Sequence, residues 1–234
     1  MSLRVYTYYE DIKFPEQDRL IKLWRESWAR NGYEPVVLSR ADAEAHPFYP
    51  EFSEKIQSLH LQITGKKIAA YGMACWLRWL AYAARGEGRF YVCDYDVINH
   101  RLEPLEPSPG LWFLDSDCPC IASGGAMEFE RLCRNFSSFA EDRLEGFAKI
   151  YRESGFVWFH DQEFLTIARK LGVEIGEMSR ERDEFLGIPS EGEFWKRKVV
   201  HYGHSIVARH CKSIGRVYSD TARCDLIEES LSRR

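Results

Sequence analysis

Two aspartates separated by one residue form the most suggestive chemical pattern in the sequence. Asp94 and Asp96 follow Arg89–Val92, an apolar run typical of a buried strand. Open α/β sheets bind their ligands beyond the carboxyl ends of the strands. Two carboxylates at such an edge suit a hard divalent cation, Mg²⁺ or Mn²⁺, that can also bind a diphosphate. The cation would neutralise the diphosphate as it leaves, which is Lewis-acid catalysis.

An Asp-x-Asp pair is a weak signal by itself, because either carboxylate can belong to a solvated turn or a helix cap. The chain has a second pair at Asp115-Ser116-Asp117. The first pair is favoured by its context. Residues 66–85 are apolar on nearly every side and predict a mostly buried helix, and Arg78 lies in its middle.

A charge in a buried helix needs a partner, and Arg78 can pair with a carboxylate or a diphosphate in bidentate geometry. The adjacent strand end, where Asp94 and Asp96 lie, would offer either partner. A structural ion pair between Arg78 and any other nearby acid is the alternative.

Three neighbouring segments resemble a stretch of the GT-A glycosyltransferases, in particular those with an Asp-x-Asp sugar-binding region. The segments are Leu77–Leu80, Gly86-Glu87-Gly88 and Phe90–Val97. The likeness extends to initiation mannosyltransferases, to capsular or toxin-type enzymes and to glycogenin-like enzymes. The motif covers about thirty residues, and the expected order of elements fits about residues 3–205.

The resemblance assigns roles to the same residues. Asp94 would contact the donor ribose or the metal, Asp96 would ligate the metal, and Arg78 would support the donor site. The chain departs from the family pattern in two places. Ala74 and Cys75 stand where an aspartate usually precedes the arginine, and Gly86-Glu87-Gly88 replaces a double glycine.

A histidine near the end of the chain resembles the late metal ligand of many GT-A enzymes. His201 lies in Val199–Tyr202, an apolar run that predicts a strand, and Gly203 follows it. His201 fits the family pattern better than His204, which stays open as the alternative. A lone histidine is also often an ordinary hydrogen-bonded residue.

The resemblance places further residues around a nucleotide-sugar donor. Asp161 begins a predicted helix over Asp161–Leu171 and would act near the anomeric carbon or the acceptor hydroxyl, although it could equally cap that helix. Glycines after a strand can let the backbone approach a sugar or simply form a tight turn. The proposed donor-binding set, which also includes Arg78, Asp94 and Asp96, is completed by Tyr6, Thr7, Tyr8, Tyr95, Gly124, Gly125 and Gln162.

The elements that must position these residues predict an α/β fold. Leu3–Tyr9, Asp18–Asn31 and Pro35–Leu38 read as strand, helix and strand, which opens a parallel sheet. Leu111–Leu114 and Cys120–Ala122 predict further strands, whereas the prolines at 47 and 50 predict an irregular segment. We expect one GT-A-like domain over residues 1–234, with a mostly parallel twisted sheet flanked by helices.

Composition excludes several classes of protein. The formal charge is −4 over 234 residues, and its basic residues are scattered, which argues against a nucleic-acid or anionic-membrane binder. No apolar stretch is long enough for a membrane span, and the N-terminus lacks the apolar region of a signal peptide. Seven cysteines, an odd number, favour free thiols and a cytoplasmic protein. Cys118-Pro119-Cys120 lacks a second ligand pair at zinc spacing, so a zinc site is not predicted.

The sequence therefore predicts a metal-dependent enzyme that moves a hexose-type sugar from a UDP- or GDP-linked donor to a sugar or glycan acceptor. Mn²⁺ or Mg²⁺ would be held by Asp94, Asp96 and His201. A nucleotidyltransferase of related fold is one alternative, but it would carry a glycine-rich basic loop after the first strand, where this chain has Thr7–Ile12. A degenerate binding or scaffold protein is the other.

Overall fold

The structure is a computed structural model that describes residues 3–12, 16–85, 88–107, 109–115, 118–173, 175–178 and 182–233. Among the sequence patterns considered above, Gly86, Glu87, Ser116 and Asp117 lie outside the described residues. Of the second aspartate pair, only Asp115 lies within the described residues.

The chain opens with the strand–helix–strand unit expected from the sequence. β1 (Arg4–Tyr8) and β2 (Glu34–Leu38) are parallel neighbours, in register from one end to the other. α1 (Gln17–Arg30) connects them and buries one face, which includes Leu20, Trp24 and Trp28. This amphipathic helix lets the second strand return to the sheet in the same direction as the first.

The main sheet is mixed: its strands are mostly parallel, as expected, but one strand runs in the opposite direction. In the described part of the chain it has six strands in the order β2-β1-β3-β6-β5-β7, which adds β3 (Arg89–Cys93), β5 (Trp112–Phe113), β6 (Ile121–Gly125) and β7 (Glu177–Met178). β6 is antiparallel to both of its neighbours, and the other pairs are parallel. The connection from β5 to β6 is too short for a parallel crossover, which explains the reversal.

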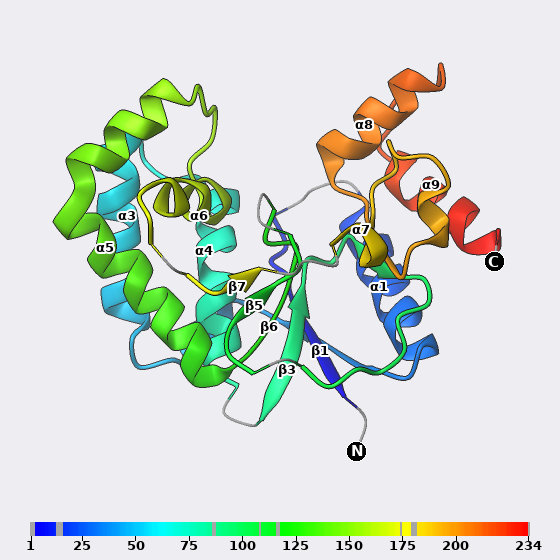
Figure 1. Cartoon of the computed structure of the whole chain (residues 1–234), viewed down its shortest axis with the longest axis horizontal. Helices are drawn as coiled ribbons and strands as arrows, with labels where there is room; N and C mark the ends of the chain where they lie inside the picture. The colour runs from blue at the N-terminus through cyan, green and yellow to red at the C-terminus, as the bar shows by residue number, and fades with distance from the viewer. Residues whose placement is uncertain are drawn as a thin grey trace.

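Helices cover both faces of this sheet, as expected for an α/β fold (Figure 1). One face carries α3 (Tyr49–Thr64), α4 (Ala70–Ala83), α5 (Ala126–Glu153) and α6 (Asp161–Lys170), and α2 (Arg40–Glu44) packs against α4. The other carries α1, α8 (His204–Ser213) and α9 (Ala222–Ser232). Alternation along the strands sends Phe90 and Val92 into the first core and Tyr91 and Cys93 into the second.

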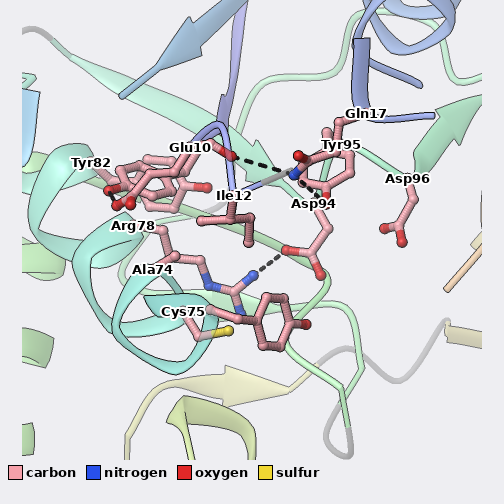
Figure 2. A pocket seen from close by; sticks show the side chains of 12 residues that line it. Glu10, Ile12, Gln17, Ala74, Cys75, Arg78, Tyr82, Asp94, Tyr95 and Asp96 are labelled. Atoms are coloured by element: carbon pink, nitrogen blue, oxygen red, sulfur yellow. Dashed lines mark hydrogen bonds and ion pairs between the residues drawn. The ribbon is translucent and has the colours of Figure 1, made fainter. Parts of the chain in front are cut away.

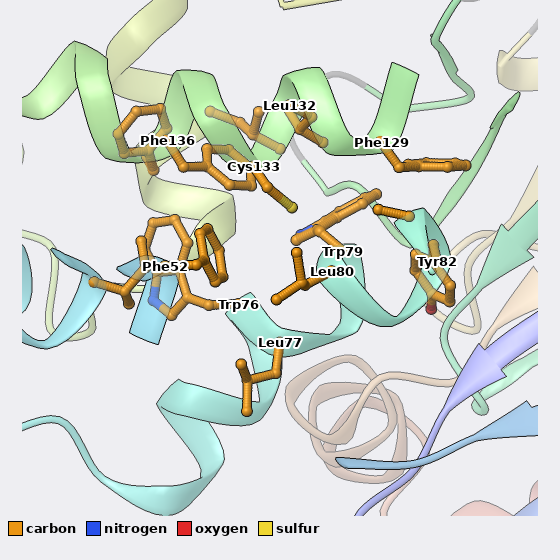
Figure 3. Close-up of a cluster of buried hydrophobic side chains, with 14 of the residues drawn as sticks. Phe52, Trp76, Leu77, Trp79, Leu80, Tyr82, Phe129, Leu132, Cys133 and Phe136 are labelled. Carbon is orange, nitrogen blue, oxygen red and sulfur yellow. The ribbon is translucent and has the colours of Figure 1, made fainter. Parts of the chain in front are cut away.

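α4 lies at the centre of the first core, and its apolar side chains contact the neighbouring helices (Figure 3). Trp76 and Trp79 are fully buried, with Trp76 packed against Phe136 and Trp79 stacked on Phe129. Both tryptophans are therefore core residues, as the apolar pattern indicates. Because α4 is wedged between the sheet and α5, Arg78 is brought into the interior with it.

The segment around Pro47 is irregular, as expected, because residues 45–48 form turns and a bend between α2 and α3, but Pro50 belongs to a helix. α3 begins at Tyr49, and Pro50 lies in its first turn. A proline fits there because the first amides of a helix have no partner within the helix. The expectation of irregular structure at Pro50 is wrong because a proline in the first turn of a helix does not interrupt it.

A small second sheet carries the late strand of the chain. β9 (Val199–His201) lies between β4 (Val97–Asn99), to which it is antiparallel, and β8 (Leu186–Gly187), to which it is parallel. α7 (Arg182–Phe185) and a 3₁₀ turn, η1 (Phe194–Lys196), flank β8. None of the helices in the described ranges combines the length and the apolar composition needed to cross a bilayer.

Candidate active site

Asp94 and Asp96 lie at the carboxyl edge of the main sheet, as the sequence predicts. Asp94 follows the last residue of β3, and β1 ends beside it because the two strands are parallel. The Asp94 amide donates to the Cys120 carbonyl at 2.9 Å, and the Val97 amide donates to the Asp94 carbonyl at 3.0 Å. These bonds fix a tight turn that joins β3 of the main sheet to β4, and both aspartates lie in this turn.

The register of the second sheet brings His201 to this turn. Val97 lies opposite His201 in the β4–β9 ladder, so the imidazole lies beside Asp96. His201 Nε2 is 3.5 Å from Asp96 Oδ1. One ligand atom each from Asp94, Asp96 and His201 lie within 4.8 Å of one another. The three residues proposed as metal ligands from the sequence are thus adjacent, although 105 positions separate Asp96 from His201.

His204, the alternative to His201, lies away from the two aspartates. It is the exposed first residue of α8, and its Nδ1 is 2.8 Å from the Tyr218 hydroxyl. Two residues, Tyr202 and Gly203, separate it from the end of β9. Of the two histidines, only His201 belongs to the aspartate cluster.

Arg78 links this cluster to a second buried carboxylate. Its Nη1 donates to Asp94, as Figure 2 shows. Its Nε and Nη2 donate to Asp161 Oδ2 at 2.9 and 2.5 Å. The expected pairing of Arg78 with the adjacent strand end is therefore present. The second partner is Asp161, the first residue of α6.

Asp161 is buried and bonded to several groups of the protein. It is 1% exposed, and its Oδ2 also accepts a hydrogen bond from Trp79 Nε1 at 2.6 Å. Its Oδ1 accepts the Gln162 amide at 3.0 Å. The cap of α6 is His160 rather than Asp161. Both oxygens are thus bonded inside the protein, and Asp161 holds Arg78 in place, while its action near the anomeric carbon or the acceptor hydroxyl stays a prediction.

The charges of the cluster are strongly coupled. Burial raises the pKa of Asp94 to about 7, with a further rise from Asp96 that Arg78 opposes. Burial also pushes the pKa of Asp96 upward, but His201 and Arg223 outweigh it and lower the pKa overall. Burial alone would lower the pKa of His201, whereas Cys118 and Asp96 raise it well above its usual value. A cation bound here would take the place of the proton on His201.

A pocket opens beside these residues (Figure 2). Its empty space, including the open mouth, is about 550 Å³. Tyr8 and Tyr95 line it, as expected for the donor set; the Tyr8 hydroxyl donates to Glu10, and Gln17 Nε2 donates to the Tyr95 hydroxyl at 3.4 Å. The other lining residues are Ile12, Tyr71, Ala74, Cys75, Arg78, Tyr82, Asp94 and Asp96.

Two residues expected to bind the donor belong to the strand interior. Tyr6 is 4% exposed, and its ring packs edge-on against Phe90 with centroids 4.7 Å apart. Thr7 is fully buried. Neither lines the pocket, because only the end of β1 reaches the carboxyl edge of the sheet. Gln162 lies next to Asp161 in the first turn of α6, partly buried and also outside the pocket lining.

Gly124 and Gly125 lie at the other end of the strands from Asp94, beside the first residues of β3. They belong to β6 rather than to a turn after it, and they pair with Phe90 and Arg89 at the start of β3. The antiparallel direction of β6 therefore carries them away from Asp94. A Cβ at Gly124 would come within 3.3 Å of Phe129. These glycines permit close packing of β6, and the structure does not bring them to the candidate site.

Two residues near the cluster were missed by the sequence reading. Arg223 of α9 is 7% exposed, and its Nη1 is 3.5 Å from Asp96 Oδ2. Cys118 Sγ is 4.0 Å from His201 Nδ1. For Arg223, the only available signal was its place beside the apolar residues Ala222, Cys224, Leu226 and Ile227. The Cys-Pro-Cys motif drew attention to Cys118, but the sequence did not show that His201 would lie beside it.

Comparisons with known proteins give only distant similarities. A family model described as a domain of unknown function (DUF8765) matches residues 3–98, which include Arg78 and both aspartates. A comparison with curated protein sequences gave no match. Two solved structures of the glycosyltransferase GlyE of Streptococcus pneumoniae TIGR4 are similar over 99% of this chain, one of them the apo form. Their identities are 12% and 10%, with TM-scores of 0.44 and 0.47, and the chain spans 64% of their length.

Proposed function

We propose that this chain is a metal-dependent glycosyltransferase of the GT-A type, with residues 1–234 as one domain. It would move a hexose-type sugar from a UDP- or GDP-linked donor to a sugar or glycan acceptor. The observation that carries the proposal is the meeting of Asp94, Asp96 and His201 within 4.8 Å at the carboxyl edge of the sheet. A pocket and the guanidinium of Arg78 adjoin that cluster.

The donor atoms suit the proposed cation. Two carboxylates and one imidazole favour Mn²⁺ or Mg²⁺, with Mn²⁺ better able to accept the nitrogen ligand. When bound, the metal would stabilise the leaving nucleoside diphosphate as a Lewis acid. Arg78 and Arg223 each lie against one of the two aspartates. Each arginine favours the ionised form of the carboxylate beside it, although burial still leaves the pKa of Asp94 raised. Both arginines also place positive charge where the diphosphate would lie.

The other side of the pocket fits an acceptor. Tyr71 lines both the pocket beside Asp94 and a second, more apolar pocket. The second pocket is lined by Trp158, which is 67% exposed, and by Lys66 and Lys67. Exposed aromatic faces bind sugar rings because they bury apolar C–H surface while the hydroxyls stay hydrated. We propose that the acceptor glycan lies on Trp158 and reaches the donor across Tyr71.

All seven cysteines are free thiols, which supports the proposal of a reducing, cytoplasmic environment. Burial is uneven among them, and only Cys75 and Cys118 are partly exposed. Such thiols persist where the compartment keeps them reduced.

Calorimetry and donor hydrolysis test the proposal. UDP and GDP are titrated into the protein with Mn²⁺ or with a chelator, and free UDP or GDP is then assayed after incubation with a panel of UDP- and GDP-sugars. We expect Mn²⁺-dependent binding of one nucleotide and slow release from one or two donors, both lost in Asp96→Asn. Asp225→Asn, a change at an exposed aspartate of α9, serves as the control.

The two alternatives give different results. Pyrophosphate released from UTP or GTP, with no binding of sugar nucleotides, would identify a nucleotidyltransferase. Metal-dependent nucleotide binding without turnover of any donor or acceptor would point to a degenerate binding protein. Absence of metal-dependent nucleotide binding altogether contradicts the proposal.

A further inference from the structure

His201 lies between two different sets of metal-ligand atoms. Its Nε2 is 3.5 Å from Asp96 Oδ1, and its Nδ1 is 4.0 Å from Cys118 Sγ. The ligand atoms of Cys118, Cys120 and His201 lie within 4.8 Å of one another. The sequence contains no second ligand pair at zinc spacing for the two cysteines, but β9 brings to them a histidine that lies 81 positions beyond Cys120 in the chain.

The local backbone holds the two thiols together at this place. The Cys120 amide donates to the Cys118 carbonyl at 2.7 Å, which tightens the turn before β6. The Cys120 carbonyl accepts the Asp94 amide, so this turn is joined to the end of β3. Cys120 is fully buried and Cys118 is partly exposed. The cluster is therefore built by two strand ends and is open to solvent through Cys118.

We propose that Cys118, Cys120 and Nδ1 of His201 form a binding site for a thiolate-preferring divalent cation, with Zn²⁺ as the ion. Two thiolates and one imidazole are a ligand set that zinc uses, and the fourth position stays open for water or another ligand. Mn²⁺ and Mg²⁺ prefer oxygen and do not compete well for sulfur. The site is thus chemically distinct from the aspartate cluster, although both use the same histidine.

Asp96 has a clear part in this second site. A histidine that ligates a metal usually donates its other ring N–H to a carboxylate, which fixes the tautomer and the ring orientation. With the cation on Nδ1, His201 Nε2 would donate to Asp96. A neutral imidazole has one lone pair for a metal, so a cation on Nδ1 takes His201 away from the aspartate cluster. His201 can therefore ligate a cation at only one of the two sites at a time.

Cobalt provides a direct probe, because Co²⁺ bound to thiolate has a charge-transfer absorption in the near ultraviolet. Reduced, metal-stripped protein is titrated with Co²⁺ and then with Zn²⁺. We expect the band to appear at one equivalent and to disappear when Zn²⁺ displaces Co²⁺. Cys118→Ser and Cys120→Ser should lose the band. Asp96→Asn should keep it while weakening Co²⁺ binding about tenfold or more.

Cys75→Ser is the matched control, because Cys75 belongs to another thiol-containing group, with His160 and Asp161. The band should persist in that variant. A band that is lost in Cys75→Ser and retained in Cys118→Ser overturns the proposal, as does the absence of any thiolate band in the wild-type protein. Circular dichroism establishes that each variant is folded.

A second measurement needs no variant. Zn²⁺ is expected to protect Cys118 of the wild-type protein from alkylation by iodoacetamide, whereas Mn²⁺ is not, and peptide mass mapping identifies the modified thiols. Equal alkylation of Cys118 with and without Zn²⁺ contradicts the proposal. Neither readout uses a sugar nucleotide, so the result is independent of the proposed transferase activity.

Discussion

Arg78 holds the buried carboxylate of Asp161 with two of its nitrogens, although 83 residues separate them in the chain. The third nitrogen reaches Asp94, so one guanidinium joins α6 to the end of β3. Arg78 belongs to α4, and both of these carboxylate partners lie outside that helix. This relationship makes the stability of the fold and the position of the candidate metal ligand depend on the same side chain.

Removal of one member of this pair should cost more than an ordinary surface substitution. Asp161→Ala leaves Arg78 buried with Asp94 as its only carboxylate partner among the described residues. We expect a loss of about 3–5 kcal/mol in the free energy of unfolding, measured by urea denaturation. Asp225→Ala, which removes an exposed partner of Arg19, should cost at most about 1 kcal/mol. Equal costs for the two variants would show that the Arg78–Asp161 pair is not buried in solution.

The two late histidines should differ in metal binding. His201→Ala removes a ligand atom from the aspartate cluster and is expected to weaken Mn²⁺-dependent nucleotide binding at least tenfold in calorimetry. His204→Ala breaks only a contact with the Tyr218 hydroxyl and should leave that binding unchanged. The reverse result would place the metal site at the start of α8.

Gly124 should matter for packing and not for the donor. A Cβ there meets Leu111 and Phe129 at 3.3 Å, which is tight for a buried position between β5 and α5. Gly124→Ala is therefore expected to lower the free energy of unfolding by about 1–3 kcal/mol. Nucleotide affinity of the folded variant should equal that of the wild-type protein. A specific loss of affinity without a change in the melting temperature would return Gly124 to the donor site.

The stability of the protein should fall in mildly alkaline solution because of His160. Burial lowers its pKa, but Asp161 and Glu163 outweigh that effect and raise it to about 9 from 6.5. A histidine with a raised pKa stabilises the folded protein fully below about pH 6.5, and this contribution disappears as the pH rises through about 9. The shift corresponds to at most about 3 kcal/mol.

Comparison of urea denaturation at pH 6 and pH 9.5, as roughly the two ends of this titration, measures the effect. His160→Gln should show a smaller decrease than the wild-type protein, because glutamine cannot carry the charge. Parallel decreases in the two proteins would mean that His160 is neutral in the folded state.

Trp158 should contribute to acceptor binding and not to the fold. Trp158 is 67% exposed, so Trp158→Ala is expected to change the free energy of unfolding by no more than about 0.5 kcal/mol. Once an acceptor has been identified, the KM of Trp158→Ala for that acceptor should be several-fold higher than that of the wild-type protein. The rate of donor hydrolysis without acceptor should be the same in both proteins. A change in donor hydrolysis alone would move Trp158 to the donor side.

The sequence by itself predicted most of the elements and the centre of the candidate site. The strand ending at Asp94 and Asp96, the buried helix with Arg78 and the opening strand–helix–strand unit could be read from periodicity, because one strand or helix contains its own pattern. The family resemblance added His201, and the structure brings that residue to the two aspartates. Local patterns were sufficient wherever the chemistry was carried by one element.

Only the tertiary structure decided which residues of different elements meet. The reversal of β6 takes Gly124 away from the site, and the packing of α6 turns Asp161 into the partner of Arg78. The approach of β9 gives Cys118 its histidine, and that of α9 brings Arg223 to Asp96. Strand direction and helix packing depend on contacts between distant segments, and no pattern within one segment records them.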